Sequence, residues 1–181
     1  MDADNASSST VYVSLENSQV TVIGITGITR SDYVFTGWNT EADGTGTAVS
    51  AGQHIQIDNA AQYTVDQNIL YAQWQQITHL IITGSDVSLT YNGSEQTNSV
   101  IAVSGLPSGY TYAGITVVPA KGTDASTTKY TGSINYSGII IYNSNMVDVT
   151  KFFKVDSAAA PTLTITKRTV TLKSADLSKA Y

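Results

Sequence analysis

The sequence predicts a mostly β protein, and three features of the chain support this prediction. Charged residues make up only 13% of the 181 residues, and glutamate is nearly absent. Threonine, valine, isoleucine and tyrosine are abundant, and these residue types favour strands over helices. Short runs of alternating apolar and polar residues recur along the chain between turns that contain glycine or asparagine. The length suits one large or two small domains.

Composition also excludes several functions. The net charge is −5 and no run of basic residues occurs, so binding to nucleic acid or to an anionic membrane surface is not expected. The chain contains no cysteine, which excludes disulfides, a thiol nucleophile and cysteine-based zinc sites. No apolar run approaches the roughly 18 residues that a membrane-spanning helix needs. We expect no cofactor, no metal and a monomeric chain.

The first strands are predicted after a polar leader, residues 1–9, which we expect to be disordered. Val11, Val13 and Leu15 alternate with polar residues and predict a strand over 10–15. A second strand is predicted around Val20 and Val22, after a turn at residues 17–18.

The segment from Tyr33 to Trp74 contains both tryptophans of the chain. Strict alternation in its first strand places Trp38 on the face opposite to Tyr33 and Phe35. Residues 39–47 then form a turn, in which Asp43-Gly44 is a strong turn dipeptide and Gly46 permits a second positive φ.

Two further strands are predicted in this segment. The first covers residues 54–57, after a short loop that ends at Gly52. The second covers residues 69–74 and places Leu70, Ala72 and Trp74 on one face. Residues 59–65 form either a short helical turn or a loop.

Several elements of this segment, taken in order, resemble the Listeria–Bacteroides repeat, which is related to internalin-type B repeats. The matching residues are Gly37, Trp38, Asn39 and Thr40, then Asp43, Gly44, Gly46 and Thr47, then Gly52, then Leu70, Tyr71, Ala72, Gln73 and Trp74. The family usually has Gly-Tyr where this chain has Ser31-Asp32-Tyr33, and the segment 58–67 is longer. The resemblance implies a small β-grasp-like module without enzyme activity, found in tandem in secreted and wall-attached bacterial proteins.

From residue 77 onward the aliphatic strands become longer and predict a second, larger all-β module, either sandwich-like or an extended β-grasp-like fold. Strands are predicted at 80–82, 87–90, 100–103, 110–118, 132–142, 146–149 and 162–166. Turns are predicted at 92–93, 105–109, 121–124 and 143–145. In residues 151–156, either Phe152 or Phe153 is expected to enter the core.

The end of the chain repeats the start of this second module at an offset of 90 residues. At that offset Asp176 matches Asp86, Leu172 matches Ile82 and Tyr181 matches Tyr91. Tyr91-Asn92-Gly93 and the last residues of the chain resemble the junctions between MBG and YDG repeats of bacterial surface proteins. The resemblance implies an extracellular β-rich spacer or adhesive module. The expected organisation is therefore a Listeria–Bacteroides-like module over 10–76, an MBG/YDG-like module over 77–168, and over 169–181 the start of a further, truncated repeat of a longer protein.

The aromatic residues of the first module allow two interpretations. Trp38, Trp74 and nearby rings could stack on sugars, but they also fill small cores efficiently, and core packing is the favoured interpretation. Tyr33 and Tyr71 are then the candidate ligand-binding residues, because they alternate out of phase with the tryptophans. The remaining motif residues, including Tyr91 and Gly93, are interpreted as structural.

Other candidate sites have weaker support. Asn39, Glu41 and Asp43 resemble the start of a calcium loop, but a β-turn explains them fully. His54 and His79 lie in no catalytic or metal-ligand motif and are interpreted as surface or junction residues. A lysine–asparagine or lysine–aspartate cross-link would draw on the lysines of the second module, namely Lys121, Lys129, Lys151, Lys154 and Lys167.

The sequence thus predicts a non-catalytic repeat region that spaces a functional domain from a bacterial cell surface, and that has a possible role in adhesion. Its partners would be neighbouring repeats of the same chain and extracellular glycans or host proteins. The alternative is a glycan- or mucus-binding module that uses exposed aromatic side chains.

Overall fold

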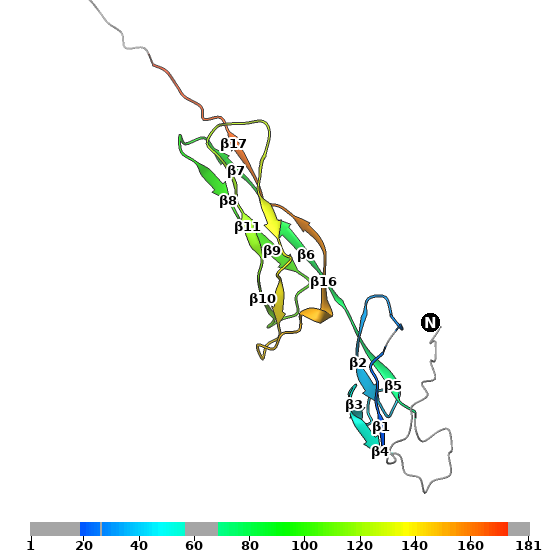
Figure 1. The fold of residues 1–181 in the computed structure, drawn as a ribbon. Coiled ribbons are helices and arrows are strands. Elements are labelled where there is room, and N and C mark those ends of the chain that lie inside the picture. The colour runs from blue at the N-terminus through cyan, green and yellow to red at the C-terminus, as the bar shows by residue number, and fades with distance from the viewer. Residues whose placement is uncertain (1–18, 26, 57–68, 174–181) are drawn as a thin grey trace, which may run out of the picture. The chain divides into compact units, whose positions relative to one another are not determined.

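The computed structural model describes residues 19–25, 27–56 and 69–173, and the chain divides into two compact units. Unit 1 comprises Met1–Ile77 and unit 2 comprises Thr78–Tyr181. Strands dominate both units, and the described residues contain no α-helix, which confirms the predicted mostly β fold (Figure 1). The predicted leader, the predicted strand over 10–15 and the turn or loop at 59–65 lie outside the described residues.

Unit 1 contains two small antiparallel sheets. In one, β1 (Gln19–Thr21) pairs with β4 (His54–Gln56). In the other, β2 (Tyr33–Asn39) lies between β3 (Ala48–Val49) and β5 (Tyr71–Gln76). The strands predicted at β1, β2, β4 and β5 are confirmed, with ends shifted by one or two residues, whereas β3 was not predicted.

Three contacts connect the segment after β1 to the rest of unit 1. Trp38 Nε1 donates a hydrogen bond to the carbonyl oxygen of Ile23 over 2.9 Å. The backbone of Val22 exchanges hydrogen bonds with Gly52 and Gln53 over 2.7 and 2.8 Å. The side chains of Val22 and Val49 are the buried apolar side chains among the described residues of this unit.

The main feature of unit 2 is a parallel ladder of two long strand runs. The first run consists of β6 (Thr78–Gly84) and β7 (Asp86–Thr90), and the second of β16 (Phe153–Ala159) and β17 (Thr162–Thr166). β6 pairs in parallel with β16, and β7 pairs in parallel with β17 (Figure 1). The first and last strand runs of the unit therefore lie side by side.

The remaining strands of unit 2 form antiparallel pairs with the ladder or with each other. β9 (Ile101–Ser104) pairs with β6, and β13 (Tyr130–Thr131) pairs with β17. The other pairs are β8 (Gln96–Asn98) with β12 (Ala120–Gly122), β10 (Thr111–Ala113) with β15 (Ile140–Tyr142), and β11 (Thr116–Val118) with β14 (Ser133–Asn135). A short 3-10 helix, η2 (Thr150–Phe152), precedes β16.

The core of unit 2 lies on the ladder. Alternate residues are buried in the middle of β6 and in β17, because successive strand residues point to opposite faces. The fully buried residues of these two strands are Leu80, Ile82, Leu163 and Ile165. Ala120, Ile141 and Pro161 complete the buried set. The alternation predicted for β17 is thus confirmed.

The structure corrects several predictions for unit 2. Residues 146–149 form no strand, and only an isolated bridge joins Tyr142 to Asp148. The predicted turn at 121–124 begins later, because Lys121 and Gly122 belong to β12. Sequence reasoning missed β8, β12, β13 and β16, which are short or poorly alternating. It also did not predict the parallel pairing, since alternation carries no information about which strands are neighbours.

Candidate functional site

The aromatic cluster of unit 1 consists of Phe35, Trp38 and Trp74. The Phe35 ring centroid lies 5.3 Å from that of Trp38 and 5.7 Å from that of Trp74, both in edge-to-face geometry. All three rings are half-buried, so they pack against each other and leave part of their surface in solvent. This geometry stabilises aromatic pairs beyond simple burial.

A β-bulge in β2 brings these rings to one face. Phe35 pairs with Trp74, whereas Gly37 pairs with Gln73, so Thr36 is an extra residue in the strand. The prediction that Phe35 faces away from Trp38 is therefore wrong, because the bulge reverses the alternation between these two residues. Gly37 has a φ of 145°, a backbone conformation that residues with a side chain rarely adopt.

The two candidate ligand-binding tyrosines do not lie together. Tyr33 is two residues before Phe35 and lies on the face of the aromatic cluster, where the Arg30 guanidinium covers its ring at 3.9 Å from the centroid. Tyr71 is 37% exposed and lies on the opposite face of the sheet from Trp74. The structure therefore separates the residues that a single stacking platform would need.

The turn after β2 is organised by the buried side chain of Asn39, which is only 4% exposed. Asn39 Nδ2 donates to the carbonyl oxygens of Gly44 and Gly46 over 3.1 and 3.4 Å, and Asn39 Oδ1 accepts from the Glu41 N–H over 2.9 Å. The amide thus spans the whole turn. At the end of the turn, just before β3, the Thr47 N–H donates a hydrogen bond to Thr40 Oγ1 over 2.9 Å.

Gly46 is required in this turn for space rather than for a positive φ. A Cβ atom at Gly46 would lie 2.3 Å from Thr40 Oγ1 and 2.8 Å from Asn39 Oδ1. The prediction of a second positive φ at this residue is wrong, since only Gly44, with a φ of 79°, adopts one in the turn.

The side-chain oxygens of Asn39 and Asp43, in the segment that resembles the start of a calcium loop, accept hydrogen bonds within the turn. Asp43 Oδ1 accepts hydrogen bonds from the Thr45 hydroxyl over 2.7 Å and from the Thr45 N–H over 3.0 Å. These bonds hold the pKa of Asp43 below its usual value. Across residues 19–25, 27–56 and 69–173, no group of three or more His, Cys, Asp or Glu side chains is arranged to hold a metal ion.

Each histidine contacts one neighbouring strand. His54 Nδ1 lies 3.0 Å from Thr21 Oγ1 on the paired strand β1. His79 Nδ1 lies 2.8 and 2.9 Å from the two carboxylate oxygens of Asp156 on β16. Asp156 is the bulged residue of β16, so this contact fixes the point where the register of the parallel ladder shifts.

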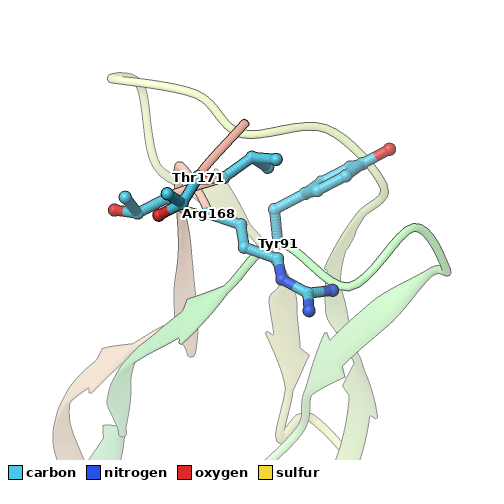
Figure 2. Close-up of a pocket in the computed structure, with 5 residues that line it drawn as sticks. Tyr91, Arg168 and Thr171 are labelled. Carbon is cyan, nitrogen blue, oxygen red and sulfur yellow. The ribbon is translucent and has the colours of Figure 1, made fainter. Parts of the chain in front are cut away.

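An open hollow lies at the end of unit 2 where β7 and β17 finish. It has a volume of about 600 Å³ and is lined by Tyr91, Arg168, Thr169, Val170 and Thr171 (Figure 2). Four of these five residues are consecutive, and all of them are exposed. The hollow therefore offers a single tyrosine ring and one guanidinium along an extended segment, without walls that would bury a ligand.

The segment that lines the hollow carries exposed apolar side chains. Val170 and Leu172 are 71% and 91% exposed, and at the 90-residue offset they match Leu80 and Ile82, which are fully buried. Tyr91 itself begins a turn in which Asn92 Oδ1 accepts the Ser94 N–H over 2.9 Å and Gly93 has a φ of 83°.

The most densely bonded group in unit 2 lies at the middle of the ladder and was missed by sequence reasoning. Asn98 is 4% exposed, and its Nδ2 donates to the carbonyl oxygens of Ser85 and Thr162 over 2.9 and 2.8 Å. Its Oδ1 accepts from the Ser85 hydroxyl over 3.0 Å and from the Val100 N–H over 3.1 Å. A single asparagine at the end of a short strand gives no sequence signal for such a role.

Beside Asn98, the Asp86 carboxylate accepts hydrogen bonds from Lys129 Nζ and, over 2.8 Å, from Thr162 Oγ1. The Lys129 bond and then the Thr162 bond lower the pKa of Asp86. Both ions are more than half exposed. Lys129 and Asp86 therefore form an ion pair that ties the loop before β13 to β7.

Comparison of the chain with protein-family models, with curated proteins and with solved structures found no match. In the part of the chain that the structure describes, no helix has both the length and the apolar character needed to cross a membrane. The arrangement of unit 2 is therefore interpreted from its own geometry.

Proposed function

We propose that this chain is a non-catalytic spacer of an extracellular bacterial surface protein, in which its modules hold another domain away from the cell. The observation that carries the proposal is the position of the chain connections of unit 2. The chain enters at Thr78, beside Phe153, and leaves after Thr166, beside Thr90. These pairs lie at opposite ends of the ladder, so the unit adds length along its strands.

The length added by each unit follows from strand geometry. The run from Thr78 to Thr90 spans roughly 40 Å at ~3.3 Å per residue. A folded ladder of this length keeps its ends apart, whereas a flexible linker samples many shorter distances. Folded units joined end to end extend in proportion to their number.

Two further features support a spacer. The resemblances of the tryptophan-containing segment and of Tyr91-Asn92-Gly93 both imply repeat modules of bacterial surface proteins. Two buried polar side chains of the described residues fix the backbone: Asn39 spans a turn, and Asn98 of β8 bonds to Thr162 of β17 and to Ser85, which lies between β6 and β7. Neighbouring repeats of the same chain are the partners that this function requires.

The proposal is tested by measuring reach. One, two and three tandem copies of the whole chain would be displayed on a bacterial surface with a fluorescent group at the outer end. Its height above the surface should rise linearly, by at least about 4 nm per copy. In the matched control, Gly/Ser linkers of equal residue number should rise only as the square root of length.

A height that does not increase with copy number, or that follows the control, would refute the spacer. Glycan binding is measured on the same protein. Saturable binding of a glycan by the isolated chain that is lost in Tyr33→Ala or Tyr71→Ala would favour the alternative, a glycan-binding module.

A further inference from the structure

We propose that unit 2 is a mechanical clamp that resists being pulled open along the chain. This inference deepens the proposed spacer function, because a surface spacer between a cell and a bound partner transmits tension through its two chain connections. It rests on the direction of the strands that carry these connections and on the contacts at the middle of their ladder.

Tension on unit 2 loads the parallel ladder in shear. The chain enters at the start of β6 and leaves at the end of β17, and the two strand runs point the same way. A pull on both connections therefore slides the runs past each other along their own axes. The interstrand hydrogen bonds lie across this direction, so many of them must break together rather than one after another.

The middle of the ladder is locked by close backbone contact. The Thr162 N–H donates to the Ser85 carbonyl oxygen over 2.9 Å. A Cβ atom at Gly84 would lie only 2.1 Å from the backbone nitrogen of the buried Pro161. Sliding of one run past the other would have to separate backbones that already touch.

Side-chain hydrogen bonds also connect the two strand runs at the middle of the ladder. Asn98 donates one hydrogen bond to each run, to the carbonyl oxygens of Ser85 and Thr162. Asp86 on β7 accepts from Thr162 Oγ1 on β17. Fully buried residues lie on each side of this lock, among them Ile82 in β6 and Leu163 in β17, so water does not readily replace a strained hydrogen bond there.

Single-molecule force spectroscopy tests the clamp. The full chain would be held between its N- and C-termini, next to domains of known unfolding force. Unit 2 should open in one step that lengthens the chain by about 26 nm, because the residues from Thr78 to Thr166 extend to about 30 nm and the folded ladder already spans roughly 4 nm.

The matched control changes only the direction of pull. Because the chain has no cysteine, Thr111→Cys and Asn145→Cys provide unique attachment points. They lie at the same end of the antiparallel pair β10/β15, in which Thr111 pairs with Tyr142. Pulling there peels hydrogen bonds one at a time, and we expect an unfolding force at least two-fold lower than along the termini.

Equal forces in the two directions, or a lower force along the termini, would overturn the clamp. This failure is distinguishable from failure of the spacer. A weak ladder would leave the height measurement linear in copy number, whereas a chain that is not a spacer would fail the height measurement whatever its unfolding force.

Discussion

Thr162 Oγ1 donates a hydrogen bond to Asp86 Oδ1 over 2.8 Å, and the two residues are register partners at the first position of the β17/β7 ladder. Lys129 donates to the second carboxylate oxygen from the loop that precedes β13. Three segments far apart in the sequence therefore meet at one carboxylate. Its ionised form is the one that accepts all of these bonds.

Asp86 should make unit 2 sensitive to acid. Its pKa in the folded state is lowered, first by Lys129 and then by Thr162, below the ordinary value of 3.8. A lowered folded-state pKa means that the stabilisation is present above about pH 4 and is lost as the pH falls through the folded-state pKa. We expect the urea midpoint of unit 2, followed by circular dichroism, to fall between pH 5 and pH 2.

The variant Asp86→Asn isolates this contribution. It should lower the midpoint at pH 7 and reduce the difference between pH 7 and pH 3. Asp124→Asn, an exposed change in the same unit, serves as the control and should keep the full difference. An unchanged acid dependence in Asp86→Asn would contradict the assignment.

Asn98→Ala should strongly destabilise unit 2. The change removes the Asn98 donor to the Thr162 carbonyl oxygen and the Asn98 acceptor of the Val100 N–H and the Ser85 hydroxyl, whereas the Ser85 carbonyl oxygen keeps the Thr162 N–H as a donor. Unsatisfied buried groups cost about 1–3 kcal/mol each, so we expect a loss of roughly 2–4 kcal/mol in the free energy of unfolding. The exposed neighbour Thr97→Ala should change it by less than about 0.5 kcal/mol, and equal effects of the two variants would argue against the lock.

Gly46→Ala should destabilise unit 1. The added Cβ would meet Thr40 Oγ1 and Asn39 Oδ1, and such overpacking costs about 1–3 kcal/mol. Both tryptophans of the chain lie in unit 1, so tryptophan fluorescence in urea reports this unit separately. In the control Gly24→Ala the added Cβ would lie near only Ala51 Cβ, at 3.7 Å, so the free energy of unfolding should hardly change. An unchanged free energy of unfolding in Gly46→Ala would show that the turn relaxes around the added methyl group.

Phe35→Ala tests the aromatic cluster. Removing the ring takes away the edge contacts to both Trp38 and Trp74, and for a half-buried phenylalanine we expect a loss of about 2–3 kcal/mol. The tryptophan emission of the folded protein should also shift to longer wavelength and become more accessible to acrylamide. The bulge residue Thr36→Ala is exposed and should leave both quantities unchanged.

Sequence reasoning succeeded where the preferences of individual residue types determine the local backbone structure. The mostly β class followed from composition, and the strand at Thr162–Thr166 followed from its alternation. The Asp43-Gly44 turn followed from a dipeptide whose backbone preference is independent of the rest of the chain.

It failed where a long-range partner decides the outcome. The bulge at Thr36 is set by pairing with β5, so the faces of Tyr33 and Phe35 could not be obtained from alternation alone. The role of Asn98 depends on Ser85, between β6 and β7, and on Thr162 of β17, which are distant from it in the sequence. Parallel pairing of the first and last strands of unit 2 likewise leaves no local pattern.

The same pairing has a consequence for how the protein is made. β6 has its parallel partner β16 about 75 residues further along the chain, so the contact order of unit 2 is high. At roughly 5–20 residues per second, β6 waits about 4–15 s during synthesis before β16 has been translated. Throughout this interval Leu80 and Ile82 lack one of their neighbouring strands. A chaperone or an export pathway that keeps the chain unfolded until it is complete would protect it best at this stage.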